Sequence, residues 1–361
     1  MLYKGYEIRD YQPDFKDQVI DLAKIIWGED RNKNKAYFEW KFERNPYFKE
    51  MIGTIGLYKG KAIAFNGLTV LKWYIDNRKN IFYTIGSTGA CTQVNHQRKG
   101  LHTAMVEYLM KKYGTSRFKL ITSFSSNPAS AAWALKTGWK IFATRKYLRR
   151  YDYWQMGKRK ILTRVKVRSN ELKKVLGKYD SIEVTQNVKP IAMANLIEKI
   201  PIHDNTISLC RDLEFMKWRF LNPSINYLFY YIWDNDKKIN GYIVVKYYSK
   251  TGAGKIVDYA YLDIQYFKKI LALLISQKHF TFLFILDVNL DEDLSKALQG
   301  FGFHQRDLIA KFIARKKINK ELCYLLKPLK DKNQVDYWYI NNLDVRKSEN
   351  WKFTEICSED V

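Results

Sequence analysis

The chain has 361 residues, of which 47% are hydrophobic and 16% aromatic, and its 62 lysines and arginines against 37 acidic residues give a formal charge of +25. The apolar content excludes a disordered chain, and the length favours two domains. Such a charge attracts anions, and the candidates are nucleic acid, an anionic membrane surface, an acidic glycan and the phosphates of a nucleotide cofactor. A lysine-rich surface that is merely solvated is an equal alternative, so the charge alone names no partner.

Cysteine spacing and hydropathy bear on the cell compartment. The four cysteines lie far apart and form no CxxC pair, which argues against a zinc site and against a disulfide framework. The start, MLYKGYEIRDY, lacks the apolar segment of a signal peptide, and the most apolar stretch, 270–286, is interrupted by polar residues. We therefore expect a soluble cytoplasmic protein, with a peripheral contact to an anionic membrane left open.

The first half predicts a regular series of elements. An alternating strand starts at Tyr6 and is followed by a turn with proline and by a helix with a period of about 3.6 residues. Two strands joined by a charged turn begin at Ile55. The series continues with a strand over 81–94, a loop over 95–99, a helix over 100–113, a strand over 119–124 and a second helix that ends in the letters TGW.

The second half repeats this series. Residues 38–46 read FEWKFERNP and residues 215–223 read FMKWRFLNP, with strands and a helix in the same order around both strings. Because Trp40 and Trp218 recur in both copies, we expect a packing role for them, with stacking on an acceptor as the alternative. The sequence predicts a first domain over 1–155, a basic linker over 156–180, a second copy over 181–330 and a strand-containing tail over 331–361.

The turn before the helix over 100–113 carries the first chemical signal. Free backbone N–H groups at the start of a helix bind phosphate, and the helix dipole adds to this attraction. Gly100 lets the backbone approach an anion closely, while Arg98 and Lys99 add positive charge. Taken alone, such a turn is more often structural than functional.

Two segments resemble the motifs of the GNAT superfamily of N-acetyltransferases. Residues 92–112, TQVNHQRKGLHTAMVEYLMKK, are similar to the acetyl-CoA signature Q/R-x-x-G-x-G/A, with Gln97 and Gly100 in the first two fixed positions and His102 in the third. Residues 127–139, NPASAAWALKTGW, are similar to the family's N-x-x-A-x-x-x-Y-x-x-x-G-F segment. The resemblance implies an α/β (α+β) protein with two tandem GNAT-like domains, each a mixed, mostly antiparallel twisted sheet flanked by helices.

The resemblance also implies a site for acetyl-CoA, which is the co-substrate in this family. Thr92 and Val94 would offer backbone groups to the pantetheine arm, and Asn127 and Ser130 would contact the lower pantetheine and the thioester. The residues that would hold the pyrophosphate are Gln97, Arg98, Lys99, Gly100, Leu101, His102 and Thr103.

The catalytic acid does not follow from these motifs. The tyrosine that often protonates the departing CoA thiolate in this family falls on Ala134. A thiolate has a pKa of about 8.5, so water or a nearby hydroxyl can replace that acid. The weak candidates in the predicted neighbourhood are Ser123, Ser125, Tyr83 and Trp133.

A general base is equally open. Glu39, Asp10 and Glu43 are candidates, although such residues more often form surface salt bridges. In some relatives the terminal carboxylate of the chain serves as base, and Val361 is the corresponding candidate here. The five histidines form no constellation typical of a metal site, so we predict no metal.

The resemblance implies an N-acetyltransferase in which an amine attacks the thioester directly within a ternary complex. The acceptor would be an amine-bearing small molecule or sugar, with an amino sugar or nucleotide-sugar preferred. One alternative is a FemABX-like transferase that uses aminoacyl-tRNA and could hold its phosphates with the +25 charge, but such proteins do not need the CoA loop at 97–103. A nucleic-acid partner is thus disfavoured but stays open because of the charge. The other alternative is a non-catalytic module that binds CoA or another anion.

In the second copy the strand over 255–264 meets its helix without a glycine-rich turn, so we expect no cofactor there.

Overall fold

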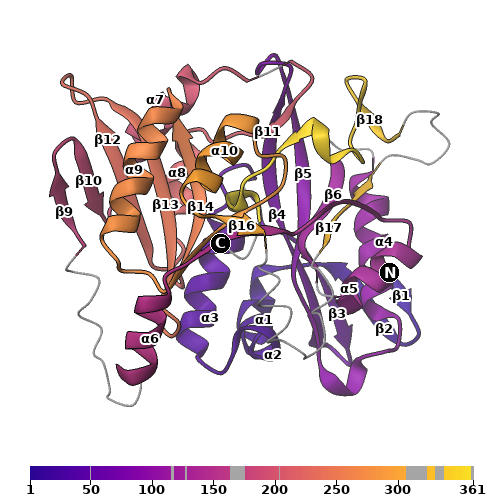
Figure 1. Cartoon of the computed structure of the whole chain (residues 1–361). Coiled ribbons are helices and arrows are strands. Elements are labelled where there is room, and N and C mark those ends of the chain that lie inside the picture. Colours follow the sequence, from indigo (N-terminus) through magenta and orange to yellow (C-terminus); the bar gives the residue numbers. More distant parts are fainter. Residues whose placement is uncertain are drawn as a thin grey trace.

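The computed structural model describes residues 1–48, 50–114, 118–126, 128–162, 175–202, 204–305, 323–329 and 337–358, with the backbone alone at 125, 126, 128, 129 and 159–162. Two mixed sheets flanked by helices form its two halves, which lie side by side (Figure 1). This arrangement confirms the predicted fold class. Within the described ranges, no helix is long and apolar enough to cross a membrane.

The first sheet has ten strands in the described part of the chain, in the order β1-β2-β3-β4-β5-β6-β17-β7, with β11 beside β4 and β20 beside β11. These strands are β1 (Leu2–Tyr3), β2 (Tyr6–Asp10), β3 (Ile52–Tyr58), β4 (Lys61–Ile75), β5 (Asn80–Thr92), β6 (Phe118–Ser126), β7 (Lys140–Thr144), β11 (Ile207–Leu209), β17 (Cys323–Pro328) and β20 (Trp351–Lys352). Most neighbours are antiparallel, whereas β5 and β6 run parallel.

The second sheet has eight described strands in the order β16-β8-β15-β14-β13-β12-β10-β9. They are β8 (Tyr147–Tyr151), β9 (Gly177–Tyr179), β10 (Ile182–Thr185), β12 (Tyr227–Trp233), β13 (Ile239–Tyr248), β14 (Ala253–Tyr261), β15 (Phe282–Leu286) and β16 (His304–Gln305). A small hairpin of β18 (Tyr339–Ile340) and β19 (Leu343–Asp344) stands apart. The parallel pair here is β14 with β15, the counterpart of β5 with β6.

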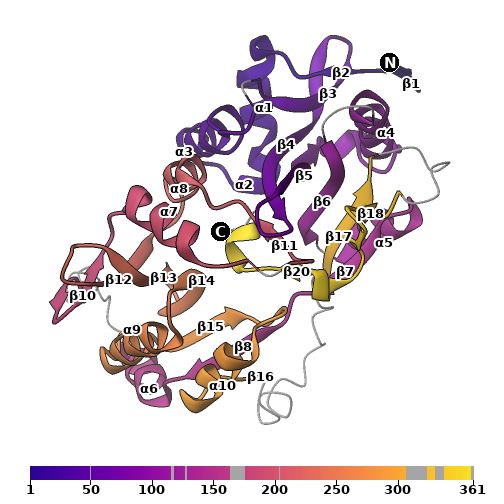
Figure 2. The ribbon, with the colours of Figure 1, turned by 90° about the horizontal axis from the view of Figure 1, so that it is seen from above.

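Helices cover both sheets, and two of them meet where the halves join. The helices are α1 (Lys16–Leu22), α2 (Lys24–Trp27), α3 (Arg31–Phe38), α4 (Leu101–Tyr113), α5 (Pro128–Lys136), α6 (Tyr153–Leu162), α7 (Pro190–Lys199), α8 (Leu213–Arg219), α9 (Ile264–Ser276) and α10 (Glu292–Gly300). A π-helical turn over Glu39–Glu43 extends α3. Seen from above, α3 and α8 lie next to each other at the junction (Figure 2).

The two halves exchange a strand. β8 follows the first half in the chain but pairs with β15 and β16 of the second sheet. β17 follows the second half but lies between β6 and β7 of the first sheet. The sequence-based bounds 1–155 and 181–330 group each strand with its neighbours in the chain, because consecutive strands usually pair with one another. The sequence-based bounds therefore did not include this exchange of strands.

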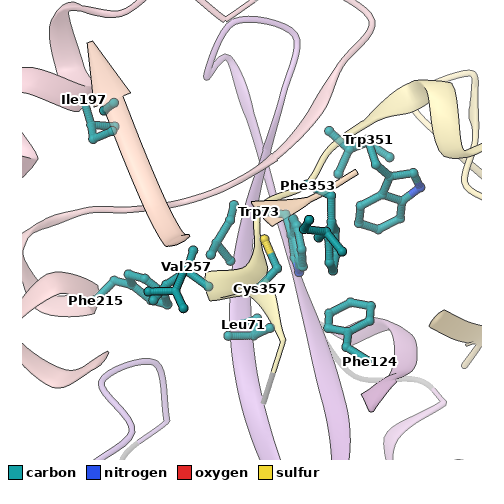
Figure 3. Packing of buried hydrophobic residues seen from close by; sticks show 14 of the residues in the cluster. Leu71, Trp73, Phe124, Ile197, Phe215, Val257, Trp351, Phe353 and Cys357 are labelled. Carbon is teal, nitrogen blue, oxygen red and sulfur yellow. The ribbon is translucent and has the colours of Figure 1, made fainter. Parts of the chain in front are cut away.

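The largest hydrophobic core lies between the halves and includes the C-terminal segment. Trp73 of β4 is fully buried, and the rings of Trp351 and Phe353 contact it at centroid distances of 5.0 and 6.4 Å (Figure 3). Phe215 and Val257 of the second half belong to the same cluster. Both halves and the tail therefore share one core, which fixes the position of each half against the other.

Candidate functional site

Strands β5 and β6 run parallel and then separate. Their described pairing ends at Gly86 with Thr122, whereas the strands continue to Thr92 and Ser126. After Gly86, the backbone groups of β5 that face β6 are therefore available to a ligand that enters the gap between the two strands. The gap lies at the carboxyl ends of two parallel strands, where ligands commonly bind in such sheets.

A bulge in β5 coincides with this gap. The register of β5 against β4 shifts between Phe65 and Gly67, because β5 carries one extra residue there. Gly89, within the bulge, has a positive φ of 74°, which glycine adopts without strain. Bulges redirect backbone groups and often lie beside active sites.

The turn from β5 to α4 is closed by its own side chains and leaves helix amides open. The side-chain Nε2 of Gln97 donates to the backbone carbonyl oxygen of Thr92 at 2.9 Å. Gly100 precedes α4 with a φ of 80°, and in the described structure no side chain caps this helix end. A Cβ on Gly100 would clash with the hydroxyl of Tyr3. The backbone conformation thus favours glycine here, and a side chain would in addition displace the Tyr3 hydroxyl.

Trp133 joins α5 to the first turn of α4. Its indole N–H donates to Thr103 Oγ1 at 2.8 Å, and its ring lies 4.6 Å from the ring of His102. Burial lowers the pKa of His102 to about 4, so the imidazole is neutral at pH 7. The histidine that replaces Gly or Ala of the signature therefore packs against an aromatic ring as an uncharged group.

Two adjoining cavities surround this turn. The smaller, of about 410 Å³, lies against Thr92, Gly100, Leu101 and Thr103. The larger, of about 970 Å³, extends from the turn to the second half. The residues that line both are Ala90, Gln97, Arg98, His102, Ser130 and Trp133.

No model of a protein family matches the sequence, and no curated protein is similar to it in sequence. Solved structures are similar over most of the chain. A probable N-acyltransferase of unknown function from Enterococcus faecalis V583 shares 10% identity with a TM-score of 0.61 over 90% of this chain and 73% of that chain. A GCN5-related N-acetyltransferase from Anabaena variabilis ATCC 29413 shares 12% identity with a TM-score of 0.58 over the same shares of both chains. N-myristoyltransferase from Saccharomyces cerevisiae, solved with myristoyl-CoA, shares 12% identity with a TM-score of 0.54 over 98% of this chain and 86% of that chain.

The chain has the fold of the GCN5-related N-acetyltransferases. The resemblance found in the sequence motifs is thereby confirmed for the fold. One motif spans the turn from β5 into α4, and the other contains α5, which follows β6 in this GNAT fold.

Most of the predicted cofactor residues lie at the two cavities of the GNAT fold. Those that line one or both are Thr92, Gln97, Arg98, Gly100, Leu101, His102, Thr103 and Ser130. Val94 is 68% exposed, and Lys99 lies beside Tyr6 and Tyr58 instead; neither lines these cavities as far as the chain is described. Asn127 lies outside the described residues.

The candidate acids differ in whether they line the larger cavity. Ser123 and Trp133 line the larger cavity. Tyr83 is not among its lining residues and packs against Tyr47 at a centroid distance of 6.3 Å. The side chain of Ser125 and the whole of Val361 lie outside the described parts of the chain.

The candidate bases are held in salt bridges away from the cavities. Lys16 binds Glu39 at 3.0 Å and Glu43 at 2.9 Å, and its hydrogen bond lowers the pKa of the Glu39 carboxyl. Asp10 binds Lys112 at 2.6 Å. Among the described residues, none of these carboxylates lines either cavity. In this GNAT fold the three carboxylates thus form salt bridges outside the two cavities.

The sequence interpretation missed the contribution of the second half to the larger cavity. Asn222, Ser224, Ile225 and Lys246 line it from that side. Asn222 belongs to the Asn-Pro string of the repeat, which was the one available signal. Nothing in the sequence distinguishes Lys246 from other strand lysines.

The matching turn of the second half is occupied by a carboxylate. Asp263 precedes α9, and its side chain accepts from the backbone N–H of Gln265 at 2.7 Å. A carboxylate on these amides would repel a phosphate and compete for the same donors. This geometry supports the expectation that the second half holds no nucleotide cofactor.

Proposed function

We propose that this chain is an N-acetyltransferase that transfers the acetyl group of acetyl-CoA to an amino group of a small or medium acceptor. One observation carries the proposal: the open amides of α4 lie where β5 and β6 separate, and a cavity runs from that point to the second half. An amino sugar or nucleotide-sugar is the preferred acceptor, and a volume of about 970 Å³ is compatible with a molecule of that size.

The first half would hold the cofactor. The amides at the start of α4 and the side chain of Arg98 would bind the pyrophosphate, because the helix dipole and the guanidinium both attract anions. The pantetheine arm would lie in the gap beyond Gly86 and hydrogen-bond to β5 as an added strand. The thioester would then reach the bulge at Gly89, where backbone N–H groups of the cavity lining would be available to stabilise an oxyanion.

Acetyl transfer requires one proton to leave the acceptor and a thiolate to depart. The amine nitrogen attacks the thioester carbon, the C–N bond forms, the C–S bond breaks, and the CoA thiolate leaves with the electron pair. Because a thiol with a pKa of about 8.5 departs readily as the thiolate and is protonated afterwards by water, the alanine at Ala134 does not prevent this step. Ser123 and water in the cavity are the groups available to exchange protons.

Two measurements test the proposal. Isothermal titration with acetyl-CoA tests the cofactor site, and release of free CoA thiol with a panel of amines tests turnover. Binding without turnover on any amine would favour a non-catalytic CoA-binding module. Absence of acetyl-CoA binding, together with a salt-sensitive gel shift of aminoacyl-tRNA, would favour the FemABX-like alternative.

A further inference from the structure

Lysines from both halves of the protein line the larger cavity. Lys33 and Lys41 of the first half and Lys246 of the second half line it, in addition to Arg98 at the turn. Lys33 lies at the exposed rim, 3.5 Å from the carboxylate of Asp30. In the described structure, the lining includes no aspartate or glutamate. The field inside therefore favours an anion over a cation.

These lysines are separate from the groups assigned to the cofactor phosphates. The smaller cavity, which encloses the turn at Gly100, is lined by Arg98 but by none of the three lysines. Lys41 is only 5% exposed, and its ammonium lies 5.3 Å from the ring of Tyr37. A charge buried in this way acts more strongly on a ligand than a solvated one.

Asn222 adds an uncharged donor to the same cavity. Its side chain is 4% exposed, and its Oδ1 accepts from the backbone N–H of Ser224 at 3.0 Å. That contact fixes the orientation of the amide, because an amide nitrogen cannot accept a hydrogen bond from N–H. The Nδ2 group has no hydrogen-bond partner within the described structure. Buried donors of this kind normally have a partner, and here a ligand can supply it.

The repeat shows what is unusual about Asn222. Its counterpart Asn45 also accepts a backbone N–H two residues on, from Tyr47 at 3.1 Å. The Nδ2 of Asn45, however, donates to the carbonyl oxygen of Val70 at 3.0 Å. The two turns are built alike, but the protein satisfies the amide donor in the first copy alone. In the second copy the donor is left at the cavity wall.

We propose that the acceptor amine carries an anionic oxygen group, a carboxylate or a phosphate, which accepts a hydrogen bond from Asn222 and is attracted by Lys41 and Lys246. This inference rests on the proposed acetyl transfer and specifies its substrate class. The two halves then divide the work, since the first holds the cofactor and the second supplies Asn222 and Lys246 to the acceptor. The same charges disfavour polyamines and other purely cationic acceptors.

Matched pairs of small amines test the inference on the full-length protein saturated with CoA, so that the cofactor's own anion sites are filled. Phosphoethanolamine is compared with ethanolamine, β-alanine with its methyl ester, and spermidine serves as the cationic probe. Binding is measured by isothermal titration, and acetylation is measured with acetyl-CoA. We expect the member of one pair that carries the anionic group to bind roughly tenfold or more tightly than its partner without it. The pair with the larger difference distinguishes phosphate from carboxylate.

Variants then assign the effect to the named residues. Asn222→Asp keeps the acceptor for Ser224 but replaces the donor with a charge, and Lys246→Met removes one cation. Each variant should lower the affinity for the anionic probe by roughly 10- to 100-fold, while the affinity for acetyl-CoA stays unchanged. Lys217→Met is the control, because this lysine pairs with Glu214 on the surface at 2.9 Å.

The outcomes separate the two proposals. If acetyl-CoA does not bind, the proposed function fails and this inference fails with it. If acetyl-CoA binds but probes that lack an anionic group bind as well as those that carry one, or no anionic probe binds at millimolar concentration, the inference alone is overturned. Unchanged affinity of the anionic probe in both cavity variants would also overturn it.

Discussion

Trp40 and Trp218 each donate their indole N–H to the backbone carbonyl oxygen of the other, at 2.8 and 2.7 Å, and their rings stack at a centroid distance of 5.5 Å. The two residues occupy matching positions in the repeat, so the copies meet through an approximately symmetric contact. Both rings are buried, and neither lines the described cavities beside the turn. The recurring tryptophan therefore serves to pack the halves together.

Replacing either ring should weaken the junction between the halves. Trp40→Leu removes one N–H donor and the stacked ring, and we expect the free energy of unfolding to fall by about 2–4 kcal/mol. The double variant with Trp218→Leu should lose less than the sum of the two single losses, because either change already breaks the stack. Urea unfolding of the four proteins measures this coupling. Strictly additive losses would show that the rings act independently.

The turn that we propose to bind the cofactor could be singled out in the sequence because its determinants are local. Gln97 and Gly100 lie within one short segment, and their roles follow from backbone conformation and helix geometry. The acceptor side could not be predicted, because Asn45 and Asn222 stand in the same string and differ only in whether a carbonyl oxygen reaches the amide. The exchange of β8 and β17 likewise depends on partners far away in the chain.

Gly100→Ala should abolish acetyl-CoA binding. A φ of 80° is unfavourable for alanine, and the new methyl group also displaces the hydroxyl of Tyr3, so we expect the turn to shift away from the position that presents its amides. Gly60→Ala is the matched control, because Gly60 also has a positive φ, of 76°, but open space around it. Isothermal titration should show binding lost in the first variant and retained in the second. Normal affinity in Gly100→Ala would contradict the assignment of the turn.

His102 should make the folded protein less stable in mild acid. Its pKa is about 4 in the folded chain, because burial disfavours the charged ring, whereas an exposed histidine has a pKa of about 6.5. Between these two values the unfolded chain binds a proton that the folded chain does not, so stability falls as the pH drops from about 6.5 towards 4. His102→Ala lacks this loss. As the pH falls across that range, the urea midpoint of His102→Ala should therefore rise relative to the midpoint of the parent protein. A difference between the two midpoints that does not change with pH would refute the prediction.

Glu355 should be the most sensitive charged position in the tail. Its carboxylate is buried between Arg145 and Lys255, with Lys255 Nζ at 2.8 Å, and it accepts from the Tyr147 hydroxyl at 3.0 Å. Burial alone would raise the pKa of Glu355, but the two cations beside it lower the pKa below its usual value. Glu355→Gln leaves both cations buried without their counter-charge, and we expect a loss of about 3–5 kcal/mol in the free energy of unfolding.

The pH dependence of this loss gives a second readout. A carboxyl whose pKa is lowered by folding stabilises the protein above its unfolded pKa of about 4.3 and loses that contribution as the pH falls further. The difference between the parent and Glu355→Gln should therefore shrink in acid. Lys217→Met, which removes a surface charge paired with Glu214, should change stability little at any pH.

The strand exchange predicts that neither half folds properly without the other. A fragment of residues 1–180 lacks β17, the strand that joins β7 to β6, and a fragment of residues 181–361 lacks β8, the strand that joins β16 to β15. Each fragment would expose open strand edges and one side of the shared core, so both should aggregate when expressed alone. Co-expression should restore a soluble complex, and the intact chain should unfold in a single transition. A monomeric, folded fragment of residues 1–180 that binds acetyl-CoA would show instead that β17 is dispensable for the first sheet.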